Sequence, residues 1–395
     1  MALKRRIGFG LLTFYGVGVM VGAGIYVLVG KVAGEAGALT PLAFLLAGIA
    51  AGLSALAFAE LSARIPESAG EAAYVREAFG IGWLGDLVGF GVAAVGVISA
   101  AAILKGGVGY LSVFIDVPRY ALEIGLGVAL GMIAIVGVLE SLSFAALFTI
   151  VEILGLLAVS WAGFVAEPVT GYGEMIEVNR LFHGAAPAVL AAALLAFFAF
   201  VGFEDMVNLA EETVDPVRTM PKAIIVALAI TTLLYCLVSV AAIRSVEPSA
   251  LAESERPLAL VFERGAGFSS AAVVGIAVFA TLNGVLAQMV MAARVLYGLG
   301  RRNRALAWAH AAHPRFGTPV AATVVITLVV ILLAQAAPID RLASVTTTIL
   351  LGVFILVNVA LIALKRRSPS PAGAPNTPIW APFLAIALSL LLLFG

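Results

Sequence analysis

Carboxylic acids inside long apolar runs are the residues of this sequence that could do chemistry. Glu204 and Asp205 follow Gly202 within one such run, and Glu152 stands alone in another. Ionised acids are costly at membrane depth, so acids found there typically pair with ions, protons or polar ligands. The single cysteine, Cys236, and three scattered histidines provide no metal cluster and no nucleophile–base pair. We therefore expect binding chemistry rather than an enzyme, with no cofactor and no metal.

The composition is dominated by apolar residues. Of the 395 residues, 62% are hydrophobic and only 12% are charged, and the mean hydropathy is +1.12. This composition excludes a soluble enzyme, a nucleic-acid-binding protein and a disordered scaffold. Lys+Arg and Asp+Glu both number 23, so net charge predicts no acidic or basic partner. The sequence therefore predicts a polytopic protein whose surroundings are the lipid bilayer.

Eleven apolar runs are long enough to be membrane helices. A helix needs about 20 apolar residues to cross a hydrocarbon core of about 30 Å. The runs cover about 8–29, 40–62, 82–112, 120–138, 142–166, 187–211, 222–245, 270–299, 319–336, 343–364 and 379–394. The first run lacks a small-residue cleavage site, so we do not read it as a signal peptide. We predict an all-α fold with one transmembrane domain over residues 1–395.

The distribution of basic residues predicts the orientation. With a cytoplasmic N-terminus, 14 of the 23 lysines and arginines lie in inside segments and 7 in outside loops, while Lys105 and Arg294 lie within runs. Short cytoplasmic loops carry the excess of positive charge in membrane proteins. We therefore expect a multi-pass inner-membrane protein with its N-terminus in the cytoplasm.

Two of the runs contain residues that interrupt a continuous helix. Glycine costs about 1 kcal/mol relative to alanine inside a helix, yet glycines stand in mid-run in the first and sixth runs. Each of these runs opens a set of five, about 8–166 and about 187–364, and 379–394 is extra. Because five is odd, the second set has inverted topology, as in transporters with a midplane site between two discontinuous helices. For the first run, packing of small residues is the alternative reading.

The interrupted segments are the candidate binding site. Half-helix ends expose N–H groups that suit a carboxylate and carbonyls that suit an ammonium group or a cation. The candidate substrate-binding residues are Gly22, Ala23, Gly24, Ile25, Phe198, Ala199, Phe200, Val201, Gly202 and Phe203.

Four sets of motifs resemble the amino acid–polyamine–organocation (APC) superfamily of permeases. They are the first run from Gly8 to Val27, the segment from Ala59 through Pro66 to Gly80, the segment from Phe197 through Glu204, Glu211 and Pro216 to Ile224, and Thr281–Asn283 with 293–297 and 314–319. The cationic-amino-acid-transporter-like branch is the most similar. The resemblance implies a LeuT-type fold with discontinuous helices one and six. Its members usually have twelve helices, whereas we count eleven runs.

The resemblance also suggests coupling residues. At a matching position in helix five, some members carry a lysine that replaces a sodium ion, whereas this chain carries Glu152. Glu152 is expected to be protonated during part of the cycle, with Thr281 as a hydroxyl partner, or else to be a structural acid. Thr281 and Asn283 either face an ion-type site or bridge helices.

Lys105 and Glu204 each have a functional and a structural reading. Lys105 either extends to the outer interface, pairs with an acid such as Glu152 or Glu204, or faces the substrate vestibule. Glu204 is expected to hold the broken helix through a hydrogen bond, rather than to contact substrate.

These observations predict a secondary transporter that works by alternating access. A neutral amino acid is favoured as the substrate, with proton-coupled symport or exchange. Cationic amino acids or polyamines remain the alternative, because Glu152, Glu204 and Asp205 are negative. Sodium remains the alternative coupling ion.

Overall fold

The chain folds into a bundle of helices. The computed structural model describes residues 5–67, 70–136, 142–169, 184–267, 269–301, 304–371 and 373–395. Its α-helices are α1 (Phe9–Val21), α2 (Ala23–Ala36), α3 (Thr40–Arg64), α4 (Gly70–Phe79), α5 (Gly82–Leu111), α6 (Arg119–Val136), α7 (Leu142–Val165), α9 (Ala186–Phe197), α10 (Pro216–Ser245), α11 (Pro248–Glu253), α12 (Pro257–Ala266), α13 (Ala271–Gly300), α14 (Val320–Ala336), α15 (Ile339–Arg367) and α16 (Trp380–Phe394). The 3₁₀ segments are η1 (Gly37–Leu39), η3 (Phe198–Phe200), η4 (Glu204–Glu212) and η5 (Arg304–His310).

The predicted all-α membrane fold is confirmed. Each of the eleven apolar runs is occupied by helix, although the last two residues of the predicted 120–138 run lie outside the described residues. Eight helical segments in the described part of the chain are long and apolar enough to cross a bilayer. Shorter apolar helices form at Phe9–Val21, Val320–Ala336 and Trp380–Phe394. Two of the predicted runs, the first and the sixth, are divided, and both divisions occur at glycine.

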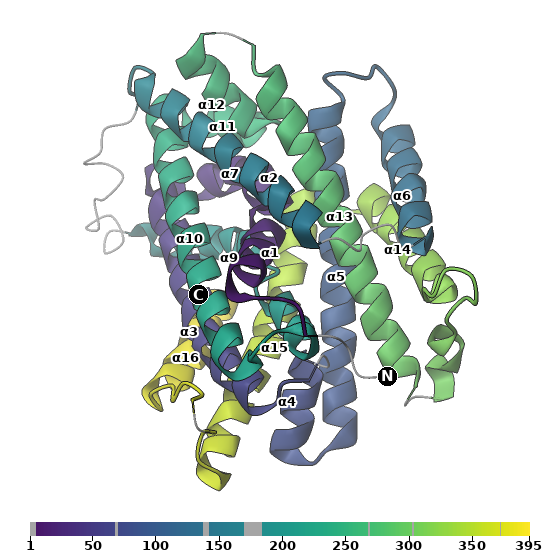
Figure 1. Cartoon of the computed structure of the whole chain (residues 1–395). Helices are drawn as coiled ribbons and strands as arrows, with labels where there is room; N and C mark the ends of the chain where they lie inside the picture. The colour runs from purple at the N-terminus through teal and green to yellow at the C-terminus, as the bar shows by residue number, and fades with distance from the viewer. Residues whose placement is uncertain are drawn as a thin grey trace.

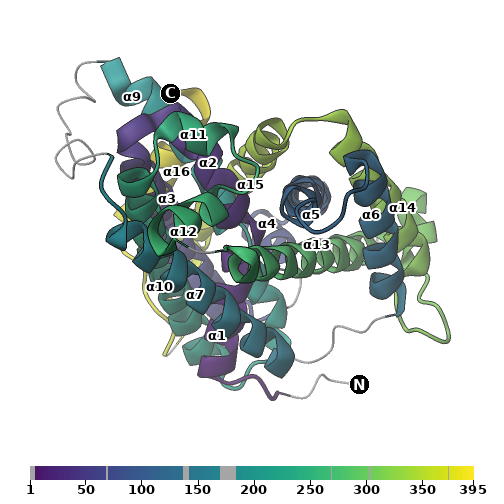
Figure 2. The same ribbon diagram turned by 90° about the horizontal axis from the view of Figure 1, so that it is seen from above.

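Three pairs of helices that hold the same position in the two predicted sets of five pack against each other. The second and seventh runs pair as α3 with α10, the third and eighth as α5 with α13, and the fourth and ninth as α6 with α14. Figures 1 and 2 show α5 and α13 side by side, with α6 and α14 at one edge of the bundle and α3 and α10 on the other side. Helix α1 of the first divided run packs on α7 and α10, and α2 packs on α9 of the sixth run.

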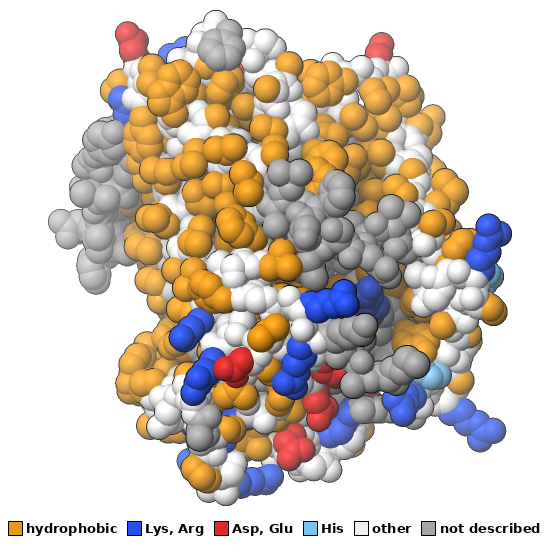
Figure 3. All heavy atoms as spheres, in the orientation of Figure 1, with side chains coloured by type: hydrophobic (Ala, Val, Ile, Leu, Met, Phe, Trp, Pro, Cys, Tyr) orange, Lys and Arg blue, Asp and Glu red, His pale blue; other side chains and the backbone are white. Residues whose placement is uncertain are grey.

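The surface agrees with a membrane-spanning bundle. On the face in Figure 3, hydrophobic side chains cover the upper two thirds, and most charged side chains gather below. Helix α4 lies in that lower region in Figure 1, whereas α11 and α12 lie at the opposite end. We refer to these as the α4 end and the α11–α12 end.

Two sets of contacts fasten the α4 end. Before α1, the N–H of Ile7 donates to the carbonyl of Glu212 (3.0 Å) and the N–H of Val214 donates to the carbonyl of Ile7 (2.9 Å). At the end of α3, the buried Glu60 accepts hydrogen bonds from Arg64 (2.7 and 2.9 Å) and from Lys365 of α15 (2.9 Å to each oxygen). These contacts tie the segments that precede and follow the divided helices to the rest of the bundle.

Candidate functional site

The first and sixth apolar runs are both broken at mid-length, and glycine provides the required backbone geometry. Gly22 joins α1 to α2 with φ −50° and ψ −138°. In the sixth run, η3 ends at Phe200, Val201 has a ψ of 128°, and Gly202 has a φ of +121°. A φ in that region is strained for any residue with a side chain. The backbone groups at these breaks are therefore released from helical pairing and can bind a ligand.

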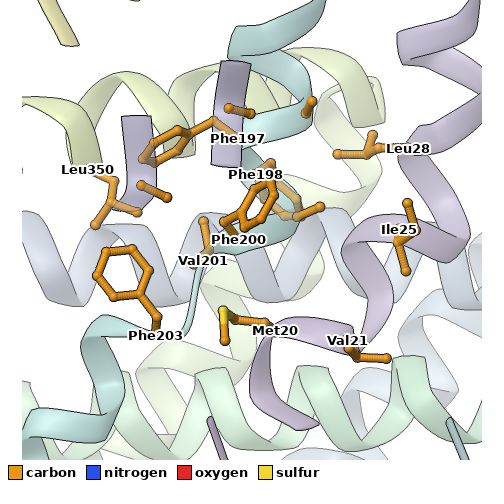
Figure 4. Close-up of a cluster of buried hydrophobic side chains, with 14 of the residues drawn as sticks. Met20, Val21, Ile25, Leu28, Phe197, Phe198, Phe200, Val201, Phe203 and Leu350 are labelled. Carbon is orange, nitrogen blue, oxygen red and sulfur yellow. The ribbon is translucent and has the colours of Figure 1, made fainter. Parts of the chain in front are cut away.

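The two breaks lie against each other. A Cβ atom at Gly24 would lie 2.5 Å from Cα of Ala199, and a Cβ atom at Gly202 would meet the side chain of Val19. Figure 4 shows Met20 and Val21 opposite Phe198, Phe200 and Val201. Glycine is needed at position 24 because the backbone of Ala199 approaches more closely than a side chain allows, and at position 202 because of its positive φ and the side chain of Val19.

Tyr235 of α10 joins the two breaks. Its hydroxyl lies 2.6 Å from the carbonyl oxygen of Met20 and 2.9 Å from the carbonyl oxygen of Ala199. Both distances are within hydrogen-bonding range. Tyr235 was not among the residues predicted from the sequence, although a tyrosine in the middle of an apolar run was the available signal.

A cavity lies beside the breaks. Its walls come from α1, α2, α5, η3 and α13, and it measures about 30 Å³. The described residues that line it are Gly18, Val19, Met20, Gly24, Ser99, Ile103, Phe198, Val201, Asn283, Gly284, Ala287 and Gln288. Ligand pockets usually measure about 300–1,000 Å³, so helices must separate before this cavity can admit an organic ligand.

The structure places only some of the predicted binding residues at the cavity. Gly24, Phe198 and Val201 line it, whereas the side chain of Ala23 lies outside the described residues. Asn283, which was predicted as a coupling residue, also lines it. Gly22, Ile25, Ala199, Phe200, Gly202 and Phe203 are buried next to it and do not line it.

Two of the predicted phenylalanines belong to an aromatic core. The ring of Phe200 packs on Tyr235 with 5.1 Å between centroids, and the ring of Phe203 packs on Phe58 (5.6 Å) and Phe354 (5.3 Å). These rings position the broken helix and leave its backbone facing α1 and α2.

Glu204 closes its own break. Its Oε2 accepts a hydrogen bond from the N–H of Gly202 at 2.9 Å, and the side chain is 2% exposed. A side chain that satisfies a freed N–H group stabilises a helix end. Glu204 therefore has the structural contact that the sequence led us to expect, and it does not line the cavity.

Glu152 is a buried acid without a side-chain partner. It is 2% exposed, and neither carboxyl oxygen has a hydrogen-bond partner among the described residues. Its backbone carbonyl accepts a hydrogen bond from the hydroxyl of Tyr26 at 3.2 Å. Thr281 is not its partner: the Thr281 hydroxyl donates to the carbonyl of Val278 (2.7 Å) and lies against Gly107 of α5.

Thr149, one turn before Glu152, donates a hydrogen bond from α7 to α1. Its hydroxyl donates to the carbonyl oxygen of Phe14 at 3.1 Å and fills the space where Gly18 lacks a side chain. Residues three apart lie on neighbouring parts of one helix face. The sequence therefore indicated the right face of α7, but it did not indicate Thr149 as the residue that hydrogen-bonds to the first half-helix.

Lys105 lies away from the cavity. Its Nζ donates to the carbonyl oxygen of Ala334 (2.8 Å) and lies 3.6 Å from Oε1 of Glu123, whose other oxygen accepts from Gln335 (2.6 Å). Of the three readings of Lys105, the structure shows pairing with an acid, but that acid is Glu123 and not Glu152 or Glu204, because α5 turns Lys105 toward α6 and α14. Lys105 braces these three helices and does not line the cavity.

Comparison with known proteins places the chain in a family. The family model described as amino acid permease matches residues 7–395. The branched-chain amino acid permease BcaP of Bacillus subtilis is 27% identical, over 100% of this chain and 88% of that protein. An uncharacterized transporter of Mycobacterium tuberculosis is 32% identical (93% and 82% covered), and cationic amino acid transporter 1 of Arabidopsis thaliana is 26% identical (98% and 67% covered). The chain is thus a multi-pass membrane transporter, not an enzyme, and it belongs to the amino acid permease family of the APC superfamily.

Proposed function

We propose that the protein is a secondary active transporter that carries a neutral amino acid across the cytoplasmic membrane by alternating access. The observation that carries the proposal is the uncharged cavity between two facing helix breaks. Since the cavity measures only about 30 Å³, loading and release require α1–α2 and α9–η4 to move relative to α5 and α13. A cycle of such openings toward alternate sides is alternating access.

The breaks supply groups for both ends of an amino acid. We infer that the substrate carboxylate binds N–H groups around Gly22, Ala23 and Gly24, where α2 begins, because helix N-termini attract anions. The substrate ammonium binds the carbonyl oxygens of Phe198, Ala199 and Val201. The first two already accept one hydrogen bond each, from the N–H of Val201 (3.2 Å) and from the hydroxyl of Tyr235 (2.9 Å), and each has a second lone pair for the substrate. The aliphatic and aromatic walls from Ile103 and Phe198 then contact the substrate side chain.

The cavity favours a neutral side chain. None of the described residues that line it is charged, and a buried charge without a partner is strongly unfavourable. The similarity to a protein named as a branched-chain amino acid permease supports the same choice.

A cationic amino acid or polyamine is the second candidate. Several plant relatives are named as cationic amino acid transporters. In addition, the carboxylate of Asp205 lies directly behind the cavity residue Gln288, whose amide donates to it at 3.3 Å. A cationic substrate that displaced Gln288 would meet this carboxylate.

We further propose that residues 8–166 and 187–364 form two inverted repeats, with 379–394 as an additional helix. The packing of α3 on α10, α5 on α13 and α6 on α14 supports this division. The basic residues favour a cytoplasmic N-terminus in the inner membrane, which places the α4 end in the cytoplasm.

We propose proton coupling through Glu152, either in symport or in exchange. It is buried, and its carboxyl oxygens have no hydrogen-bond partner in the part of the chain that the structure describes; this supports the role, because such an acid is much more stable when it is protonated. Sodium coupling is the alternative, in which the carboxylate and nearby carbonyls hold the ion. Thr281 and Asn283 of α13 lie beside the break at Gly22 in the first apolar run.

Binding and counterflow measurements test the proposal. Purified protein is heated with leucine, isoleucine, valine, alanine, arginine, lysine or putrescine, since a ligand that binds the folded state raises its melting temperature. We expect the neutral branched amino acids to raise the melting temperature and to support counterflow in proteoliposomes. Stabilisation by arginine, lysine or putrescine alone would select the second candidate. A panel without any stabilising or exchanging compound would contradict amino acid transport.

A further inference from the structure

A line of polar contacts leads from the cavity toward the α4 end. Ser99 and Gln288 both line the cavity, and the Oγ of Ser99 lies 3.1 Å from the Oε1 of Gln288. The Nε2 of Gln288 donates to the Oδ2 of Asp205 at 3.3 Å. All three residues are buried, at 4% exposure or less for Ser99 and Gln288 and 6% for Asp205. Asp205 can therefore respond to changes in the cavity through two side chains.

A third acid, Glu71, lies beyond Asp205. It belongs to the first turn of α4, which packs against η4: a Cβ atom at Gly70 would lie 3.0 Å from the side chain of Val207. Glu71 is 3% exposed, and its Oε1 has no hydrogen-bond partner among the described residues. The Oδ1 of Asp205 likewise has none there. Each acid thus has a buried oxygen available to hold a proton.

The charges around Glu71 and Asp205 favour a state in which at least one of these two acids is protonated. Glu71 is near enough to Asp205 and Glu204 for their negative charges to repel. Tyr15 of α1 lies near Asp205 on one side and near Arg294 of α13 on the other, and Tyr74 lies near both Glu71 and Glu67. Arg294 is the one cation in this group of described residues, and no hydrogen bond or ion pair joins it to either acid. Three buried carboxyl groups whose negative charges repel one another cannot all be ionised without a paired cation.

The environment of Glu71 agrees with this view. Burial raises the pKa of the Glu71 carboxyl to about 8, and the charge of Asp205 acts in the same direction. A group with a pKa near the cytoplasmic pH exchanges protons readily.

We propose that Glu71 and Asp205 form a second proton-carrying pair, distinct from Glu152, which exchanges the coupling proton with the cytoplasm. This inference rests on the proposed function, namely proton-coupled amino acid transport. A proton that leaves Asp205 is taken up by the Glu71 carboxylate and is then released to water, and no other bond changes. Gln288 and Ser99 connect this exchange to the state of the cavity.

The test compares pH dependence in proteoliposomes with radiolabelled leucine as the probe. The variants are Glu71→Gln and Asp205→Asn, with Glu71→Asp as the conservative variant and Glu67→Gln as the matched control, because Glu67 is exposed just before α4. Two properties are measured: leucine counterflow at equal pH on both sides, and leucine accumulation driven by a pH difference.

We expect Glu71→Gln to retain counterflow but to lose its pH dependence between about pH 6 and 9. With a difference of about one pH unit, one coupled proton supports up to about tenfold accumulation, and Glu71→Gln and Asp205→Asn should both lose it. Glu71→Asp, which can still hold a proton, should recover part of the accumulation. Glu67→Gln should match the unmodified protein.

Each other outcome is decisive. If Glu71→Gln and Asp205→Asn keep the pH profile and the accumulation of the unmodified protein, the proposal is wrong. The same conclusion follows if Glu152→Gln removes the pH dependence while Glu71→Gln and Asp205→Asn retain it. It also follows if the unmodified protein exchanges leucine independently of pH. If Asp205→Asn is not monodisperse, the decision rests on Glu71→Gln. Absence of counterflow for every amino acid would overturn the proposed function instead.

Discussion

Ala199 occupies the place where Gly24 would otherwise carry a side chain. A Cβ atom added to Gly24 would lie 2.5 Å from Cα and 3.0 Å from Cβ of Ala199. Gly24 lies in the first turn of α2 and Ala199 in the sixth-run break, so the two discontinuous helices touch backbone to backbone. This contact brings the two sets of free backbone groups to one cavity.

Replacement of Gly24 by a large side chain should separate the two breaks. We expect Gly24→Leu to abolish leucine binding, measured as the ligand-induced rise in melting temperature, while the protein stays monodisperse. Gly275→Leu is the matched control, because a Cβ atom at Gly275 meets nothing within 4 Å. Normal leucine binding by Gly24→Leu would show that the break at Gly22 serves only packing.

Glu152→Gln should separate binding from coupling. The amide resembles the protonated acid, so leucine affinity should change by less than about threefold, which is below 1 kcal/mol. Accumulation driven by a pH gradient should be lost, and exchange should remain. Glu123→Gln is the control, since Glu123 is also a buried acid but pairs with Lys105 and Gln335. Uptake that requires sodium would instead assign an ion-binding role to Glu152.

Lys105→Met should leave substrate selectivity unchanged. The lysine braces α5 against Ala334 and Glu123 and does not line the cavity. Loss of these contacts should lower the free energy of unfolding by about 1–3 kcal/mol. Competition of arginine against leucine uptake gives the selectivity. A gain of arginine transport would show that Lys105 acts on the substrate path.

Glu60→Gln should destabilise the protein more than a surface change. Glu60 is fully buried between Arg64 and Lys365 and also accepts from Ser370 (2.7 Å) and the N–H of Thr377 (2.8 Å). Removal of one member of a buried charged set costs about 3–5 kcal/mol. Denaturation in detergent should show this loss, whereas the exposed Glu67→Gln should remain close to the unmodified protein.

Glu71 should make stability depend on pH. Its pKa in the folded protein is about 8 because of burial, against an ordinary value of about 4.5. The folded state therefore binds this proton more tightly than the unfolded chain does. The stabilisation is fully present below about pH 4.5 and is lost as pH rises through about 8, by a few kcal/mol in total at about 1.4 kcal/mol per unit. The melting temperature should thus fall between about pH 5 and 9, and Glu71→Gln should flatten this slope. An equal slope of melting temperature against pH in the unmodified protein and in Glu71→Gln would contradict this prediction.

Local sequence was sufficient to predict the helices and their breaks. Apolar runs of about 20 residues can satisfy their backbone in a bilayer only as helix, and this rule located all eleven runs. Gly22 and Gly202 marked the breaks because the backbone requirement of a glycine is a property of the residue itself. The hydrogen bond from the N–H of Gly202 to Glu204 also spans only two positions.

The contacts between distant helices were decided only by the tertiary structure. Asp205 and Gln288 are 83 positions apart, and Lys105 meets Ala334 across 229. The partner of each side chain depends on how far its helix is rotated and how deep it packs, and a shift of one turn exchanges neighbours. That is why Thr149, three positions before Glu152, donates the hydrogen bond to α1. By itself, the sequence determined a membrane transporter with two broken helices, while packing selected which polar side chains border its cavity.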